Sequence, residues 1–149
     1  MDIKIKEVNS TNYNDIISLS LKDSQKTYIE PPLQCLQDAK DCRYYKPVGL
    51  YVDDILIGFA MYGYFPNEEN GGRVWLDRYL IDRKYQGQGY GKILLNTLIE
   101  HLGVLYNCKE VYLSIYEDNV AAINLYKLFG FHFNGEKDLN GELVMVKKL

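Results

Sequence analysis

The fold of this chain is decided by one stretch, Tyr85-Gln86-Gly87-Gln88-Gly89-Tyr90-Gly91-Lys92, which carries three glycines at alternate positions. The stretch follows a strand-like run over 74–82 and precedes 93–106, where apolar residues recur at helical spacing. A glycine-rich turn that opens a helix leaves several backbone N–H groups free, and the helix dipole adds partial positive charge there. Such a turn binds phosphate or pyrophosphate without a basic side chain. The plainer alternative is a tight strand-to-helix turn.

Two common nucleotide motifs do not fit this stretch. A Walker A loop needs Ser or Thr after Gly-Lys, whereas Gly91-Lys92 is followed by Ile93. In the Rossmann pattern the third glycine comes one residue later, near the start of a βαβ unit. What fits is Gln-x-x-Gly-x-Gly, formed by Gln86, Gly89 and Gly91.

A second motif runs from Asn119 to Phe131, after a strand-like run over 111–116. Asn119 suits a helix start, because its side chain can accept from early backbone N–H groups. Gly130 suits a helix end in the left-handed conformation. Between them lie Ala122 and Tyr126.

Together the two motifs resemble the GCN5-related N-acetyltransferases, in which the first binds the acyl-CoA pyrophosphate. The resemblance covers nearly the whole chain, and it is greatest to bacterial spermine/spermidine acetyltransferases, on residues 42–50, 57–62, 73–78 and 131–136. It implies an α/β fold: one domain over 1–149, with a central mixed sheet flanked by helices and a splayed strand pair that holds acyl-CoA. The implied activity is acetyl transfer from acetyl-CoA to a primary amine of a polyamine.

The resemblance also implies the cofactor-binding residues. The N–H groups of 88–92 should hold the pyrophosphate, and the backbone around Leu80 and Asp82 should pair with the pantetheine arm. Asn119 and Asn124 could touch the cofactor, although a plain helix cap explains Asn119 equally well. The expected set is Leu80, Ile81, Asp82, Gln86, Gly87, Gln88, Gly89, Tyr90, Gly91, Lys92, Asn119 and Asn124.

Two residues are candidates for catalysis. Tyr126 matches the family's general acid, a phenol near the CoA sulfur, although a tyrosine on a helix is usually part of the core edge. Asp77 is the candidate proton acceptor, acting through water, because an acid on an apolar strand is costly to bury unless it is paired. A salt bridge to Arg73 or Arg78 is the alternative. On an ideal strand Asp77 shares a face with Trp75, Tyr79 and Ile81, and a bulge is expected in this strand.

The acceptor side is expected to offer carboxylates for the charges of a polyamine and aromatic faces for its methylene stem. Each candidate could equally be solvated surface or core packing. The candidates are Glu30, Asp38, Asp41, Glu68, Glu69, Tyr28, Tyr62 and Trp75.

Composition indicates which partners, metals and cellular locations are expected. A net charge of −3 disfavours nucleic acid, and an apolar run of about 18 residues, as a membrane span needs, is missing. Three cysteines without a CxxC pair, and two distant histidines, indicate reduced thiols in a cytoplasm and no metal cluster. A homodimer is expected from the resemblance. The rival functions are acetylation of another small amine or a protein amine, and a non-catalytic CoA-binding module.

The expected order of elements is β-α-α-β-β-β-α-β-α-β-β. Two strands, 48–52 and 55–62, should pair around Asp53-Asp54, and two final strands should pair about Asn140-Gly141. The first strand is expected at 4–8, and the remaining helices at 13–22, 33–42 and 119–129.

Overall fold

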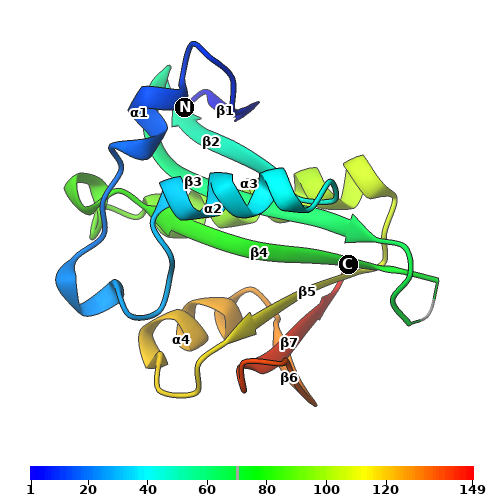
Figure 1. Cartoon of the computed structure of the whole chain (residues 1–149). Helices are drawn as coiled ribbons and strands as arrows, with labels where there is room; N and C mark the ends of the chain where they lie inside the picture. Colours follow the sequence, from blue (N-terminus) through cyan, green and yellow to red (C-terminus); the bar gives the residue numbers. More distant parts are fainter. Residues whose placement is uncertain (70) are drawn as a thin grey trace.

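The computed structural model, which describes residues 1–69 and 71–149, is built around a seven-stranded mixed sheet of order β1-β2-β3-β4-β5-β7-β6 (Figure 1). Neighbouring strands pair antiparallel except β4 and β5, which are parallel. The strands are β1 Ile3–Glu7, β2 Lys46–Val52, β3 Ile55–Phe65, β4 Arg73–Ile81, β5 Glu110–Ile115, β6 His132–Lys137 and β7 Leu143–Lys148.

Helices cover both faces of the sheet (Figure 1). The short α1 (Tyr13–Ile17) and α2 (Pro32–Asp41) pack on one face, where Ile16, Leu36 and Phe59 are buried together. The long α3 (Tyr90–Tyr106) and α4 (Val120–Leu128) pack on the other face, over the larger core cluster. This arrangement confirms the expected mixed sheet flanked by helices.

One expected helix is shorter than its sequence pattern indicates. The pattern predicts a helix over 13–22, but α1 ends at Ile17 and a 3₁₀ turn follows at Asp23–Gln25. The backbone of Ser20 is engaged elsewhere, since its C=O accepts from Arg83 N–H at 2.8 Å and its N–H donates to Asp82 at 3.4 Å. These bonds fasten the segment to the end of β4 and prevent the helix from continuing.

The parallel strands β4 and β5 are splayed. Within the described residues they share one registered pair, Trp75 with Tyr112, beyond which the two strands diverge toward their C-terminal ends (Figure 1). In the described part of the chain no backbone ladder fills the gap there, so the facing edges of β4 and β5 remain available to a ligand. The splayed strand pair expected from the resemblance is therefore confirmed.

The expected bulge in β4 is also present, and it lies at Asp77. Met61 pairs with Arg78 and Tyr62 pairs with Leu76, so Asp77 is the extra residue. The bulge resets the alternation of the strand, because Leu76 and Tyr79 both pack in the α3 cluster while Leu80 packs in the α1–α2 cluster. The expectation that Asp77 shares a face with Tyr79 and Ile81 was therefore wrong.

Three further features of the described residues concern membrane-spanning helices, cysteine pairing and metal-binding groups. No helix in the described part of the chain is long and apolar enough to cross a membrane. Cys35, Cys42 and Cys108 have free thiols. Among residues 1–69 and 71–149, no group of three acidic, cysteine or histidine side chains could hold a metal ion.

Candidate active site between the splayed strands

A cleft of about 1140 Å³ occupies the gap between β4 and β5. Its walls come from β4, the C-terminal half of β5, the start of α4, the glycine-rich loop and the β6–β7 hairpin. The segment before α2 reaches the far wall, since the Tyr28 hydroxyl donates to the Asp118 carbonyl at 3.4 Å and the Tyr28 and Tyr116 rings lie 6.2 Å apart. The cleft therefore joins segments from both ends of the chain.

The glycine-rich loop ends in a helix start that is open to ligand. Gly87 and Gly89 have φ values of +78° and +89°, which favour glycine. The helical bonds of α3 begin with Ile93 N–H, which donates to the Gly89 carbonyl at 3.3 Å. The N–H groups of residues 89–92 precede this bond and lie at the positive end of a 17-residue helix. This geometry suits an anionic pyrophosphate.

Two side-chain contacts hold the loop against the rest of the protein. Gln86 and Gln25 exchange amide hydrogen bonds of 2.9 and 3.1 Å, and Gln86 also donates to the Ile81 carbonyl at 2.9 Å. The Tyr79 hydroxyl donates to the Gly91 carbonyl at 2.6 Å, which ties the first turn of α3 to β4. Gln86 thus supports the loop from the side.

The free edge of β4 is formed by different residues from those expected. Asp82 N–H already donates to Ile57 of β3 at 2.9 Å, whereas the Ile81 carbonyl points away from β3 toward Gln86. Backbone direction alternates along a strand, so Tyr79 and Ile81 face the cleft with their N–H and C=O groups. Leu80 and Asp82, the residues expected to pair with the pantetheine arm, therefore direct their backbone groups toward β3. The buried Asp82 carboxylate instead binds the N-terminal segment, through Ser20 N–H.

Tyr126 lies on α4 and lines the cleft. Its ring packs edge-on against Phe131 with centroids 5.6 Å apart, and its carbonyl accepts from Phe129 and Phe131 N–H groups at 3.1 Å. Burial raises the pKa of the Tyr126 phenol above its usual value, so the hydroxyl keeps its proton at neutral pH. A fixed, protonated phenol in a cleft can donate a proton.

Asp77 also lines the cleft and is paired with Arg78. Its Oδ2 lies 2.8 Å from the Arg78 guanidinium, and the same guanidinium lies 2.7 Å from Glu30 without hydrogen-bond alignment at Nε. The salt bridge to Arg78, one of the two alternatives for Asp77, is therefore present. Burial raises the pKa of Asp77, and Arg78 opposes that rise. A half-buried carboxylate with a nearby counter-charge can accept a proton through water.

Further carboxylates and aromatic rings line the part of the cleft that is bounded by the segment before α2, the β3–β4 loop and the β6–β7 hairpin. This part is called the acceptor end. Of the sequence candidates, Glu30, Glu68, Tyr28 and Trp75 line it. Asp38, Asp41 and Glu69 do not, and Tyr62 is buried in the core with its hydroxyl 3.2 Å from His101 Nε2. Sequence reasoning missed Asp138 and Glu142 of the β6–β7 hairpin, which also line the cleft. The only local signal there was a turn pattern.

Asp138 and Glu142 form a close carboxyl pair. One oxygen of Asp138 accepts from the N–H groups of Asn140 and Glu142, each at 2.9 Å, which fixes the turn. Burial, followed by the hydrogen bond and charge of Asp138, raises the pKa of Glu142 to about 7. Glu142 therefore retains its proton up to near-neutral pH.

The remaining predicted site residues divide into two sets. Those that line the cleft are Leu80, Ile81, Gln86, Gly87, Gly91 and Asn119. Asn119 precedes α4 without a side-chain capping bond. Those outside the cleft wall are Asp82, Gln88, Gly89, Tyr90, Lys92 and Asn124.

Solved structures of N-acetyltransferases share this fold. One is a spermidine N-acetyltransferase from Vibrio cholerae in complex with CoA and spermine, with a TM-score of 0.73, 17% identity and coverage of 98% of this chain and 95% of the other. Another is the PaiA N-acetyltransferase from Thermoplasma acidophilum in complex with coenzyme A, with a TM-score of 0.67, 19% identity and full coverage of both chains. At these identities the likeness establishes the fold alone.

The chain belongs to the Acetyltransferase (GNAT) family, whose model matches residues 13–131. It is 57% identical over 152 aligned positions, covering all of both chains, to the spermine/spermidine N(1)-acetyltransferase of Bacillus subtilis strain 168. The family resemblance drawn from the two motifs is thereby confirmed.

Proposed function

We propose that this protein transfers an acetyl group from acetyl-CoA to a primary amine of a polyamine such as spermine or spermidine. The observation that carries the proposal is one cleft that joins a phosphate-binding helix start, the Tyr126 phenol and a wall of carboxylates and aromatic rings. The full-length relative from Bacillus subtilis, named for spermine and spermidine, supports the same acceptor class.

The cleft suits direct transfer without a covalent enzyme intermediate. The N–H groups at the start of α3 hold the pyrophosphate, and the free edge of β4 at Tyr79 and Ile81 pairs with the pantetheine arm. The amine loses its proton through water to Asp77, and its nitrogen then forms a bond to the thioester carbon. As the carbon–sulfur bond breaks, the departing sulfur takes the proton of Tyr126, and the second proton that the attacking nitrogen loses on becoming an amide restores the phenol. Holding the reactants together supplies much of the acceleration.

Asp77→Asn should lower kcat/KM for spermidine by about tenfold at about pH 6, with a smaller loss at higher pH. The reason is that the acceptor amine is almost fully protonated at low pH and depends most on a proton acceptor there. Rates across a pH series, with Asp41→Asn as the control for an exposed carboxylate outside the cleft, measure the difference. An equal loss at every pH contradicts the proton-acceptor role.

Spermidine should bind more tightly as pH rises through about 7, where Glu142 loses its proton. The groups that face Glu142 are Asp138 on its own hairpin, Arg78 on β4 and Glu30 before α2. Above pH 7 Glu142 carries a negative charge, which favours a polycation. Calorimetric Kd values measured in the presence of CoA should show this dependence, and Glu142→Gln should remove it. A Kd that stays constant in the wild type between about pH 6 and 8 contradicts the assignment.

The acceptor class is tested by a panel of amines in which release of CoA is followed. The panel contains spermine, spermidine, a simple alkylamine, an aminoglycoside and a lysine peptide. The polyamines should have the highest kcat/KM, because each additional cationic contact contributes about 1 kcal/mol. Preference for the aminoglycoside or the peptide would indicate that the acceptor is another small amine or a protein amine. If no amine were acetylated, the protein would be a non-catalytic CoA-binding module.

The remaining parts of the proposal concern organisation and location. One domain over 1–149 is consistent with the single sheet. The family resemblance favours a homodimer. The free thiols favour a cytoplasmic location, and the net charge of −3 disfavours a nucleic-acid partner.

A further inference from the structure

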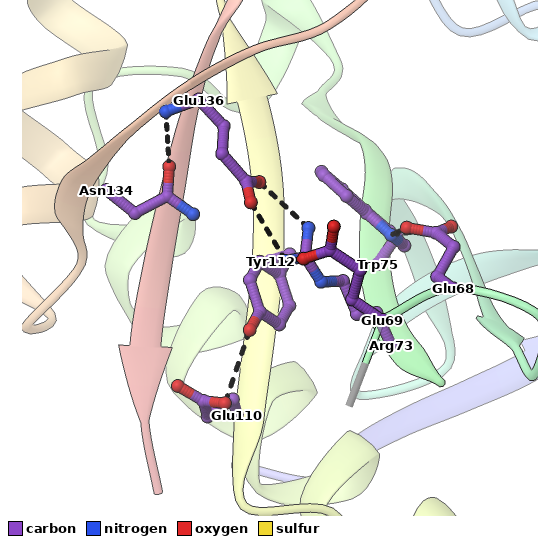
Figure 2. A network of polar contacts seen from close by, with 8 residues as sticks. All are labelled: Glu68, Glu69, Arg73, Trp75, Glu110, Tyr112, Asn134 and Glu136. Carbon is purple, nitrogen blue, oxygen red and sulfur yellow. Dashed lines mark hydrogen bonds and ion pairs between the residues drawn. The ribbon is translucent and has the colours of Figure 1, made fainter. Parts of the chain in front are cut away.

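A polar network is centred on Arg73 at the start of β4 (Figure 2). Two of its members, Glu69 and Glu136, adjoin the cleft-lining residues Glu68 and Lys137. The Arg73 guanidinium makes two parallel contacts to Glu136 of β6, at 2.8 and 2.9 Å. It lies 3.5 Å from Glu69 in the β3–β4 loop and 4.4 Å from the centre of the Tyr112 ring on β5. Only 10% of the Arg73 side chain is exposed. One side chain therefore contacts β5, β6 and the β3–β4 loop.

The backbone of β6 is shaped to deliver Glu136 to this network. The pairing of β6 with β7 is interrupted between Phe133 and Lys137, and Gly135 adopts a φ of +90°. Asn134 accepts from the Glu136 N–H at 2.9 Å, which holds the irregular segment (Figure 2). An irregularity of this kind redirects a side chain, here toward Arg73.

The network supports two segments that carry carboxylates into the cleft. Glu69 adjoins Glu68, whose carboxylate accepts from Trp75 Nε1 at 2.9 and 3.1 Å (Figure 2). Glu136 lies two residues before Asp138, which begins the turn that carries Glu142. The β4–β5 backbone has one registered pair in this region among the described residues, so side chains must supply the rest of the connection. Arg73 itself does not line the cleft.

We propose that Arg73 is a positioning residue for the acceptor: by binding Glu136 and Glu69 together, it sets the spacing between Glu68 and the Asp138–Glu142 pair. This inference rests on the proposed function, because that spacing matters only for an acceptor with several positive charges. Arginine suits the task, since its planar fork binds a carboxylate at two points and stacks on a ring. Lysine keeps the charge and loses both features.

Arg73→Gln and Glu136→Gln should each raise KM for spermidine by about tenfold, below the roughly 100-fold that a misplacement of about 1 Å can cost. The Kd for acetyl-CoA should stay unchanged, because the glycine loop lies at the other end of the cleft. Arg73→Lys should have a smaller effect on KM. The double variant should be no worse than the more impaired single variant, since both remove one interaction. The control is Lys4→Gln, which removes an exposed ion pair on β1.

Hydrogen exchange supplies a readout that needs no acceptor. The Glu142 N–H, which donates to Asp138, should exchange faster in Arg73→Gln than in the wild type. Its exchange rate should be unchanged in Lys4→Gln. An unchanged exchange rate of the Glu142 N–H in Arg73→Gln overturns the proposal, and so does an unchanged KM for spermidine. A general loss of structure, in which KM and the acetyl-CoA Kd both rise while Tm falls, overturns it as well. Failure of the wild type to acetylate polyamines contradicts the proposed function, and the exchange measurement then decides the positioning role alone.

Discussion

Tyr126→Phe is expected to lower kcat by about 100-fold, the lower range for loss of a general acid. The substitution keeps the ring that packs against Phe131, so the fold and the affinity for acetyl-CoA should be preserved. What is lost is the proton that burial keeps on the phenol, through its raised pKa. Single-turnover rates, compared with calorimetric affinities, separate the chemical step from binding.

The matched control for this variant is Tyr106→Phe. The Tyr106 hydroxyl is buried without a hydrogen-bond partner in the described part of the chain, and Tyr106 does not line the cleft. Removing it should leave kcat unchanged. If Tyr126→Phe retains the wild-type single-turnover rate, another group protonates the departing sulfur and the role assigned to Tyr126 is wrong.

Gly89→Val should weaken acetyl-CoA binding by about thirtyfold or more, equivalent to about 2 kcal/mol. Among the described residues, apart from its chain neighbours, no atom lies within 4 Å of a Cβ added at Gly89, so the effect does not come from a clash of the Cβ with the core. It comes from the φ of +89°, which a β-branched residue adopts only under strain. A loop that relaxes from this conformation no longer directs its N–H groups toward the pyrophosphate.

Gly135→Val provides the control, because Gly135 has a φ of +90° and equally open surroundings but lies on β6, whereas Gly89 directly precedes the first turn of α3. Both variants should lose similar stability, measured as Tm. Acetyl-CoA affinity should fall in Gly89→Val alone. A folded Gly89→Val variant with wild-type affinity would remove the loop from the cofactor site.

The glycine loop, α3 and the Gly130 helix end could be predicted because their signals are local. A positive φ at glycine and the periodicity of Leu94, Leu98 and Leu102 depend on neighbours within a few residues. The splay of β4 and β5 has no local signal and came from the family resemblance. The mixed sheet also followed from the order of such local elements.

The features that could not be predicted depend on contacts between distant residues. The helix expected over 13–22 stops early because Ser20 binds the backbone after β4. Glu142 enters the cleft because β7 pairs with β5, and a carboxylate beside a turn looks like ordinary surface in the sequence. Arg73 and Glu136 are 63 positions apart, and the bulge that aims Glu136 cannot be read from its neighbours.

An internal cation and a proton partly neutralise the carboxylates at the acceptor end of the cleft. Arg78 lies between Asp77 and Glu30, so one internal cation partly neutralises the carboxylates there. The pair of Asp138 and Glu142 is partly neutralised in a different way, by the proton that the raised pKa of Glu142 retains. A polyamine must therefore compete with a guanidinium and a proton, which links affinity to pH.

The proposed function requires that one cleft, between β4 and β5, hold both substrates. A crystal structure of the ternary complex with CoA and spermidine tests it most directly. The pyrophosphate should lie at the N–H groups of residues 89–92, the CoA sulfur beside the Tyr126 hydroxyl, and the polyamine between Glu30 and the Asp138–Glu142 pair. Spermidine bound outside this cleft, or a CoA sulfur remote from Tyr126, would contradict it.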